Sequence, residues 1–211
     1  MGPEGTIKTT RKGVGRFVVR ARGKAAHAGL DPEGGASAIL ELSHVIQSLF
    51  QLNDPQRGVS VNVGTIDGGI RPNVIAPESK AVIDVRVQSQ ADAERIGEAI
   101  KSIRPQTAGV ELEIDGFIGR PPLEPTPANT ALWELARNLG TELGLDLADG
   151  LAGGGSDGST ASQYTATLDG LGPVGDGAHA RHEHLLIDRT LERTALLAML
   201  IMAPALELPN A

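Results

Sequence analysis

Three glycine-rich loops carry the residue types that could do chemistry. They are residues 23–29 (GKAAHAG), 153–158 (GGGSDG) and 175–183 (GDGAHARHE). Glycine allows a backbone to come close to a ligand, and loops held by a rigid scaffold carry many binding and catalytic groups. Neutral imidazole is the commonest metal ligand, and a nearby carboxylate can fix its tautomer. His179 with Glu183 therefore suggests half of a zinc site.

Each loop also has a simpler interpretation. His27, His179, His182 and His184 could be solvent-exposed loop histidines without a task. Ser156 or Asp157 could be the N-cap of a helix, and the alternative, about equally supported, is that residues 153–158 form a loop that contacts an anion. No single loop distinguishes between these interpretations. The order of the loops along the chain is more specific.

Composition excludes several classes of protein. The 211 residues are 40% apolar, with five aromatic residues and a formal charge of −7, which is ample for a core but poor for binding nucleic acid. The absence of cysteine removes disulfides and thiolate ligands. No apolar run approaches the roughly 18 residues that span a bilayer, and residues 1–15 do not resemble a signal peptide. We expect a soluble, cytoplasmic protein without a membrane partner.

Periodicity predicts the elements that position the first loop. Two-residue alternation or β-favouring runs predict strands at residues 15–21, 59–66, 81–87 and 110–114. Apolar residues at steps of three and four predict helices at residues 35–50 and 91–103, the first with Ile39 on its buried stripe and His44 off it. The resulting order, β-α-β-β-α-β, is that of a ferredoxin-like sandwich with two helices on one face of a sheet.

The rest of the chain follows a proline-rich stretch at residues 120–127. Helices are predicted at 129–142, just after the 153–158 loop, and at the C-terminus, where Asp188 is the expected N-cap; residues 165–168 could be a strand. The expected fold is α+β, with three parts. Residues 1–12 would be a connector without regular structure, 13–115 the sandwich, and 116–211 part of an α/β domain.

Taken in order, the motifs GKAAHAG, GGIRPNVIAP, IDVR, GRPPLEP, GGGSDG and GDGAHARHE resemble one family. It is the family of carboxypeptidase G, the aminoacylases and succinyl-diaminopimelate desuccinylase, and the resemblance covers nearly the whole chain. It implies a catalytic domain with two zinc ions and an inserted ferredoxin-like lid that makes a homodimer. The substrate would be a small peptide or an N-acyl amino acid.

The resemblance also implies roles for individual residues. His27 would reach the partner subunit's active site and stabilise the oxyanion there, with Asn73 contacting the substrate close by. Arg120 would bind a substrate carboxylate, and Gly153, Gly154 and Gly155 would line the substrate pocket. His179 would be the last ligand of the metal site.

The remaining zinc ligands and the general base of the family precede the lid, and by this register they fall before Met1. Glu4 lies several residues too late to replace one, so we expect it to be a surface loop residue. The chain is therefore expected to be a truncated enzyme, inactive alone. Two alternatives stay open: a non-catalytic dimerisation or interaction module, and an anion-binding regulatory domain, which would leave the 175–183 loop without a role.

Overall fold

The computed structural model describes residues 5–206, so Glu4 lies outside the described residues. The chain divides into two compact units. The sandwich unit is Gly13–Pro121, and the second unit combines Met1–Lys12 with Pro122–Ala211.

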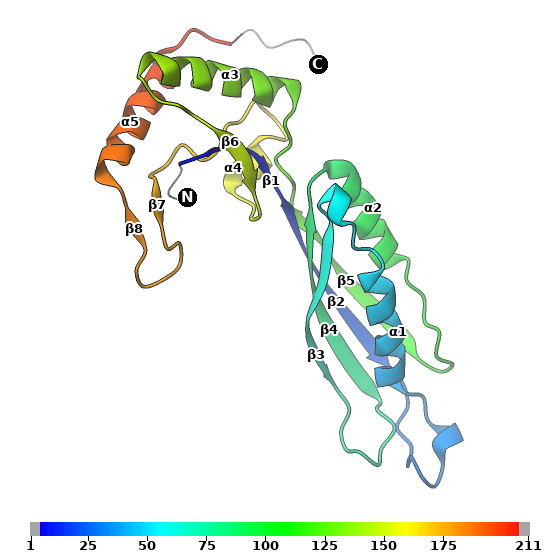
Figure 1. Ribbon diagram of the computed structural model, residues 1–211. Coiled ribbons are helices and arrows are strands. Elements are labelled where there is room, and N and C mark those ends of the chain that lie inside the picture. The colour runs from blue at the N-terminus through cyan, green and yellow to red at the C-terminus, as the bar shows by residue number, and fades with distance from the viewer. Residues whose placement is uncertain (1–4, 207–211) are drawn as a thin grey trace. The chain divides into compact units, whose positions relative to one another are not determined.

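The sandwich unit has the predicted order of strands and helices (Figure 1). Its elements are β2 (Gly13–Arg22), α1 (Ala38–Phe50), β3 (Ser60–Gly68), β4 (Glu78–Val87), α2 (Gln90–Lys101) and β5 (Glu111–Arg120). The four strands form one antiparallel sheet in the order β3-β4-β2-β5, with β3 and β5 at its edges. This is the ferredoxin-like arrangement, and the α+β prediction is confirmed.

Alternation along the strands explains why one face of this sheet is covered. Phe17 and Val19 of β2, and Ile83 and Val85 of β4, are fully buried, whereas the residue between each two is partly exposed. The buried set packs against apolar residues of both helices, so α1 and α2 lie on the same sheet face. A serine caps the N-terminus of each helix, because its hydroxyl oxygen accepts a backbone N–H of the first turn. The capping residue is Ser37 for α1 and Ser89 for α2.

Two residues of α1 differ from the expected pattern. Ile39, placed on the buried stripe, is 48% exposed, whereas Glu41 is fully buried. Glu41 is retained in the core because its Oε2 accepts backbone N–H groups of Gln106 and Thr107, at 3.0 and 2.6 Å. The carboxylate thereby holds the turn between α2 and β5 against α1.

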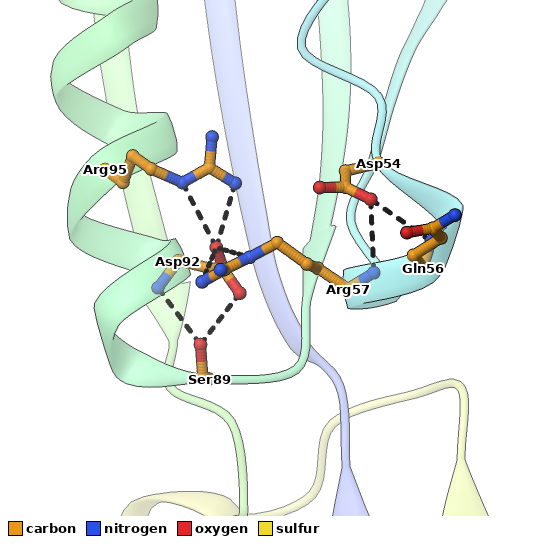
Figure 2. Close-up of polar contacts among 6 residues, drawn as sticks. All are labelled: Asp54, Gln56, Arg57, Ser89, Asp92 and Arg95. Atoms are coloured by element: carbon orange, nitrogen blue, oxygen red, sulfur yellow. Dashed lines mark hydrogen bonds and ion pairs between the residues drawn. The ribbon is translucent and has the colours of Figure 1, made fainter.

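A buried carboxylate also ties the start of α2 to the turn before β3 (Figure 2). Oδ1 of Asp92 accepts from Arg57 Nε at 3.0 Å and from Arg95 Nη2 at 2.8 Å, and Ser89 Oγ donates to Oδ2 at 2.9 Å. Burial alone would raise the pKa of Asp92, but these donors outweigh burial and hold the pKa below its ordinary value of 3.8.

The second unit contains the remaining elements. They are β1 (Ile7–Arg11), α3 (Pro127–Glu142), β6 (Asp149–Ala152), α4 (Asp157–Ala161), β7 (Gly175–Asp176), β8 (His184–Leu185) and α5 (Ile187–Met202). β1 pairs with β6 in parallel, and β7 pairs with β8 as a short antiparallel hairpin. Ile7 of β1 packs with Trp133 and Ala136 of α3 in a small apolar core.

Several expectations for this unit were wrong. Residues 7–11 are a strand rather than an irregular connector, because β6, which was not predicted, supplies a partner from far along the chain. Residues 165–168 form no strand; next to them Asp169 makes a single bridge to Lys8. The N-cap of α5 is Leu186, and Asp188 lies in the first turn, where its charge still suits the helix N-terminus.

Among residues 5–206, no helix is both long enough and apolar enough to cross a bilayer.

Candidate functional site

His27 and Asn73 lie beside each other in the sandwich unit. The Ala28 N–H donates to the Asn73 carbonyl and the Ile75 N–H to the Ala26 carbonyl, each at 3.0 Å. These bonds flank an antiparallel bridge between His27 and Val74. The two loops that carry the predicted residues are therefore paired, with both side chains exposed.

The hydrogen bonds of the His27 ring select its tautomer. Nδ1 accepts the backbone N–H groups of Gly29 at 3.1 Å and Leu30 at 3.2 Å. A ring nitrogen that accepts two N–H groups carries no proton of its own, so the neutral ring has its proton on Nε2. His27 thus offers one N–H donor, on the ring nitrogen that the loop does not use.

Arg120 is the last residue of β5, where it pairs with Val14 of β2. Its side chain is exposed. Because β5 continues to this residue, Arg120 belongs to the sandwich unit. A guanidinium at a strand end is held at its base by the sheet, which suits recognition of a planar carboxylate.

Gly153, Gly154 and Gly155 join the end of β6 to Ser156, the N-cap of α4. Gly153 and Gly154 are exposed, and a Cβ added to either would meet no atom within 4 Å. No neighbour in the described chain requires glycine there. The open space is consistent with a loop that leaves room for another molecule.

Two charged residues beside this loop were missed from the sequence. Nε of Arg11, in β1, donates to Oδ2 of Asp169 at 2.7 Å, and Nη1 donates to the Gly154 carbonyl at 3.0 Å. Burial would raise the pKa of Asp169, but hydrogen bonds from Ser156, Arg11 and the Gly170 N–H lower it below its ordinary value. Asp169 precedes Gly170 in the sequence, and Arg11 lies between Thr10 and Lys12, so neither position showed that the two charges lie close together. Their proximity depends on the β1–β6 pair, which was not predicted.

His179 lies in the hairpin between β7 and β8 and is exposed. Its φ of +65° is the one positive value of a non-glycine residue among residues 5–206. Such backbone conformations are strained and concentrate at functional sites. The Glu183 carboxylate accepts the His179 backbone N–H at 3.3 Å, so it steadies the main chain, where a contact to the ring was expected.

The two strands of this hairpin approach each other closely, and only glycine fits at position 175. A Cβ at Gly175 in β7 would collide with the His184 carbonyl of β8. Asp176 then accepts the Gly177 N–H at 2.8 Å, which fixes the turn that leads to His179. The residues GDGAH thus form a tight turn that leaves the imidazole of His179 exposed.

The described residues do not fit a complete metal centre. No group of three or more His, Asp or Glu side chains able to hold an ion occurs within residues 5–206. His179 could supply one ligand, and a single imidazole holds a metal weakly. No catalytic step can therefore be derived through a metal from these residues.

The predicted site residues fall into two sets. The sandwich unit holds His27, Asn73 and Arg120, of which the first two lie together. The second unit holds the glycine loop and His179.

Comparison with known proteins identifies the first of these units. Residues 9–111 match the family model for a peptidase dimerisation domain of the M20 family. The sandwich is a peptidase dimerisation domain. The family resemblance inferred from the ordered motifs is thereby confirmed, with the dimerisation domain where the ferredoxin-like sandwich was predicted.

Individual relatives extend the likeness beyond the dimerisation domain. Carboxypeptidase G2 of Pseudomonas sp. (strain RS-16) is 26% identical over 198 residues, which are 90% of this chain and 47% of that protein. The fold resembles the aminopeptidase PepT of Bacillus cereus, with a TM-score of 0.75 and 21% identity, over 95% of this chain and 54% of that one.

A third protein has a similar fold: the YXEP protein of Bacillus subtilis, which is described as a dinuclear metal-binding peptidase of the M20 family. The TM-score is 0.67 and the identity 17%, over 94% of this chain and 52% of that one. The chain spans about half the length of each of these three proteins.

Proposed function

We propose that this chain is the dimerisation domain and C-terminal catalytic part of a zinc-dependent hydrolase. The enzyme would cleave an amide bond next to a carboxylate in a small peptide or an N-acyl amino acid. Its relatives include a carboxypeptidase and an aminopeptidase, and the chain matches them over nearly its whole length. The observation that carries the proposal is the paired arrangement of His27 and Asn73, since it orients a single N–H donor on an exposed loop.

His27 would act as the oxyanion donor. When water attacks an amide, negative charge develops on the carbonyl oxygen, and a preorganised N–H that meets that oxygen lowers the barrier. Nδ1 is occupied by two backbone N–H groups, so Nε2–H is the donor available for this role. Asn73, on the paired loop, would contact the same substrate.

Arg120 would hold the substrate carboxylate. Its guanidinium can donate two parallel hydrogen bonds to a planar anion, which fixes the orientation of the group next to the scissile bond. The glycine loop would line the pocket, because a chain without side chains lets a substrate approach the main chain. His179 would supply one of the metal ligands, and the others would come from segments that precede the lid in the family.

The sandwich unit would make the homodimer through its β3 edge. Both β3 and β5 are edge strands, but β5 carries three exposed acidic residues, Glu111, Glu113 and Asp115. Glu113 and Asp115 pair with Arg20, and covering such charged groups with a second copy would cost their desolvation. β3 has one charged residue, Asp67, and an exposed Ile66. A groove of about 420 Å³ between β3 and α1, lined by Ile39 and Ile46 among others, continues the apolar surface. Pairing of two copies along β3 would bury both Ile66 and this groove.

A dimerisation module without catalysis is the second candidate. The same β3 edge favours it, and residues 5–206 supply too few ligands for a metal centre of their own. The hydrolysis test separates the two candidates, because a module without catalysis would show no zinc-dependent turnover even when it is joined to the preceding segments. Zinc titration of the chain adds a check on both, since tight stoichiometric zinc binding would contradict a site with one ligand. The cytoplasmic location remains a prediction.

The test of the proposal is hydrolysis of an N-acyl glutamate by the polypeptide that carries this chain together with the catalytic segments preceding it in the family. The enzyme is assayed after chelation and again after zinc is restored. We expect turnover that is lost on chelation and recovered with zinc. A folded, dimeric, zinc-loaded protein that turns over no N-acyl amino acid or dipeptide would refute the proposal.

A further inference from the structure

One guanidinium connects three segments of the second unit. Arg11 uses Nε for Asp169 and Nη1 for the Gly154 carbonyl, at 2.7 and 3.0 Å. Its side chain is 17% exposed and that of Asp169 20%, so the pair is shielded from water on most sides. A partly buried, charge-assisted pair of this kind holds its geometry better than an exposed one.

Asp169 extends the connection to the far end of the glycine loop. Its Oδ2 accepts the Ser156 hydroxyl, and its Oδ1 accepts the Gly170 N–H at 2.5 Å. Ser156 is the N-cap of α4 and directly follows Gly155. The carboxylate therefore fixes the residue at which the loop ends.

The glycine loop has little else to hold it. Three successive glycines are the most flexible tripeptide a chain can contain. Within residues 5–206, the hydrogen bond from Arg11 to the Gly154 carbonyl is the one that the tripeptide makes. The N–H groups of Gly153, Gly154 and Gly155 have no acceptor in the described chain, so they remain available to a ligand.

We propose that Arg11 and Asp169 are positioning residues for the glycine loop: Arg11 holds its middle at Gly154, and Asp169 holds its end through Ser156. Together they fix where the loop presents its main-chain N–H groups. The inference rests on the proposed function to the extent that this loop lines a substrate pocket. The anchoring itself is a property of the chain and can be measured without activity.

The experiment reports directly on loop mobility. The chain has no cysteine, and a Cβ at Gly153 meets no atom within 4 Å, so Gly153→Cys can carry a nitroxide label without a clash. The electron paramagnetic resonance spectrum of that label gives its rotational correlation time. We compare the labelled parent with Arg11→Gln, Arg11→Lys, Asp169→Asn and a matched control, Arg189→Gln, which breaks an exposed ion pair to Glu192 in the same unit.

The expected result separates positioning from general stability. Arg11→Gln should shorten the correlation time about twofold or more, into the range of free loops. Arg11→Lys keeps the charge beside Asp169 but lacks the second N–H arm, so the loop should loosen while the melting temperature stays near that of the parent. Asp169→Asn should loosen the loop as well, and Arg189→Gln should leave the spectrum unchanged.

An activity measurement on the complete enzyme adds a second readout. A loosened loop should raise KM more than it lowers kcat, because the loop binds substrate without reacting with it. If the label in folded Arg11→Gln and Arg11→Lys moves as it does in the parent, the inference is overturned whatever the activity. If the label loosens as expected but the parent enzyme has no activity, the anchoring stands and the proposed function fails.

Discussion

His27 and Val74 form an antiparallel bridge that joins two loops 47 positions apart in the sequence. The bridge brings Asn73 next to Ala28, and it leaves the imidazole exposed with its Nδ1 occupied by backbone donors. In the proposed function, this conformationally fixed N–H donor does not act within its own unit. Its use would be in another subunit.

Removing the buried charge at Asp92 should destabilise the sandwich unit. Asp92→Asn removes the negative charge that Arg57 and Arg95 share. We expect the free energy of unfolding, measured by urea denaturation, to fall by about 1–3 kcal/mol. The matched control is Asp115→Asn, which breaks an exposed pair with Arg20 and should change stability by less than about 0.5 kcal/mol. Equal losses in the two variants would contradict this account of Asp92.

Stability should fall in acid partly because of Asp92 and Asp169. Both carboxyls have folded pKa values below the ordinary 3.8, so each stabilises the fold at pH values above 3.8. That contribution is lost as the pH falls through the depressed pKa. Urea denaturation from about pH 7 down to about pH 3 should show a smaller decrease for Asp92→Asn than for the parent. Parallel curves would exclude a role for Asp92 in the acid sensitivity.

Strain at His179 should appear as a difference between two substitutions. Because φ at this residue is +65°, His179→Gly should be more stable than His179→Ala by about 1 kcal/mol. Ala178→Gly, at the neighbouring position without positive φ, serves as the control and should lower stability. The measurement is thermal unfolding of the three variants. An alanine variant as stable as the glycine variant would mean that the turn is unstrained.

The homodimer should depend on the β3 edge. Ile66 is 62% exposed on β3, and Ile66→Lys would place a charge in the apolar surface that a second copy should cover. We expect the variant to sediment as a monomer at concentrations where the parent is a dimer. Phe117→Lys, on the opposite edge strand β5, is the control and should leave the dimer intact. A monomeric Phe117→Lys with a dimeric Ile66→Lys would assign the interface to β5.

Local patterns were sufficient for the sandwich but not for the second unit. Each element of the sandwich has a local pattern that predicts it without reference to the others. Residues alternate around Phe17 and Ile83 in the strands, and apolar residues recur at steps of three and four in α1, at Leu42, Val45 and Leu49. β1 and β6 are short, and each is a strand because of the other. A pair separated by some 140 residues leaves no local period to detect.

The candidate site divides in the same way. Loops rich in glycine with a histidine or serine could be recognised in sequence, as His27, Gly153–Gly155 and His179 were. Arg11 and Asp169 could not, because their role depends on a contact across 158 positions. The burial of Glu41 could not be predicted either, because the backbone N–H groups that donate to its carboxylate lie in the turn after α2.

The most direct test of the account is a mixture of two variants of the complete enzyme. His27→Ala and His179→Ala are each expected to be nearly inactive against an N-acyl glutamate. If His27 of one subunit serves the site that contains His179 of the other, half of the randomly mixed dimers have one intact site, so about a quarter of the parent activity should return. A mixture that exchanges subunits yet stays as inactive as its components would contradict a site shared between subunits.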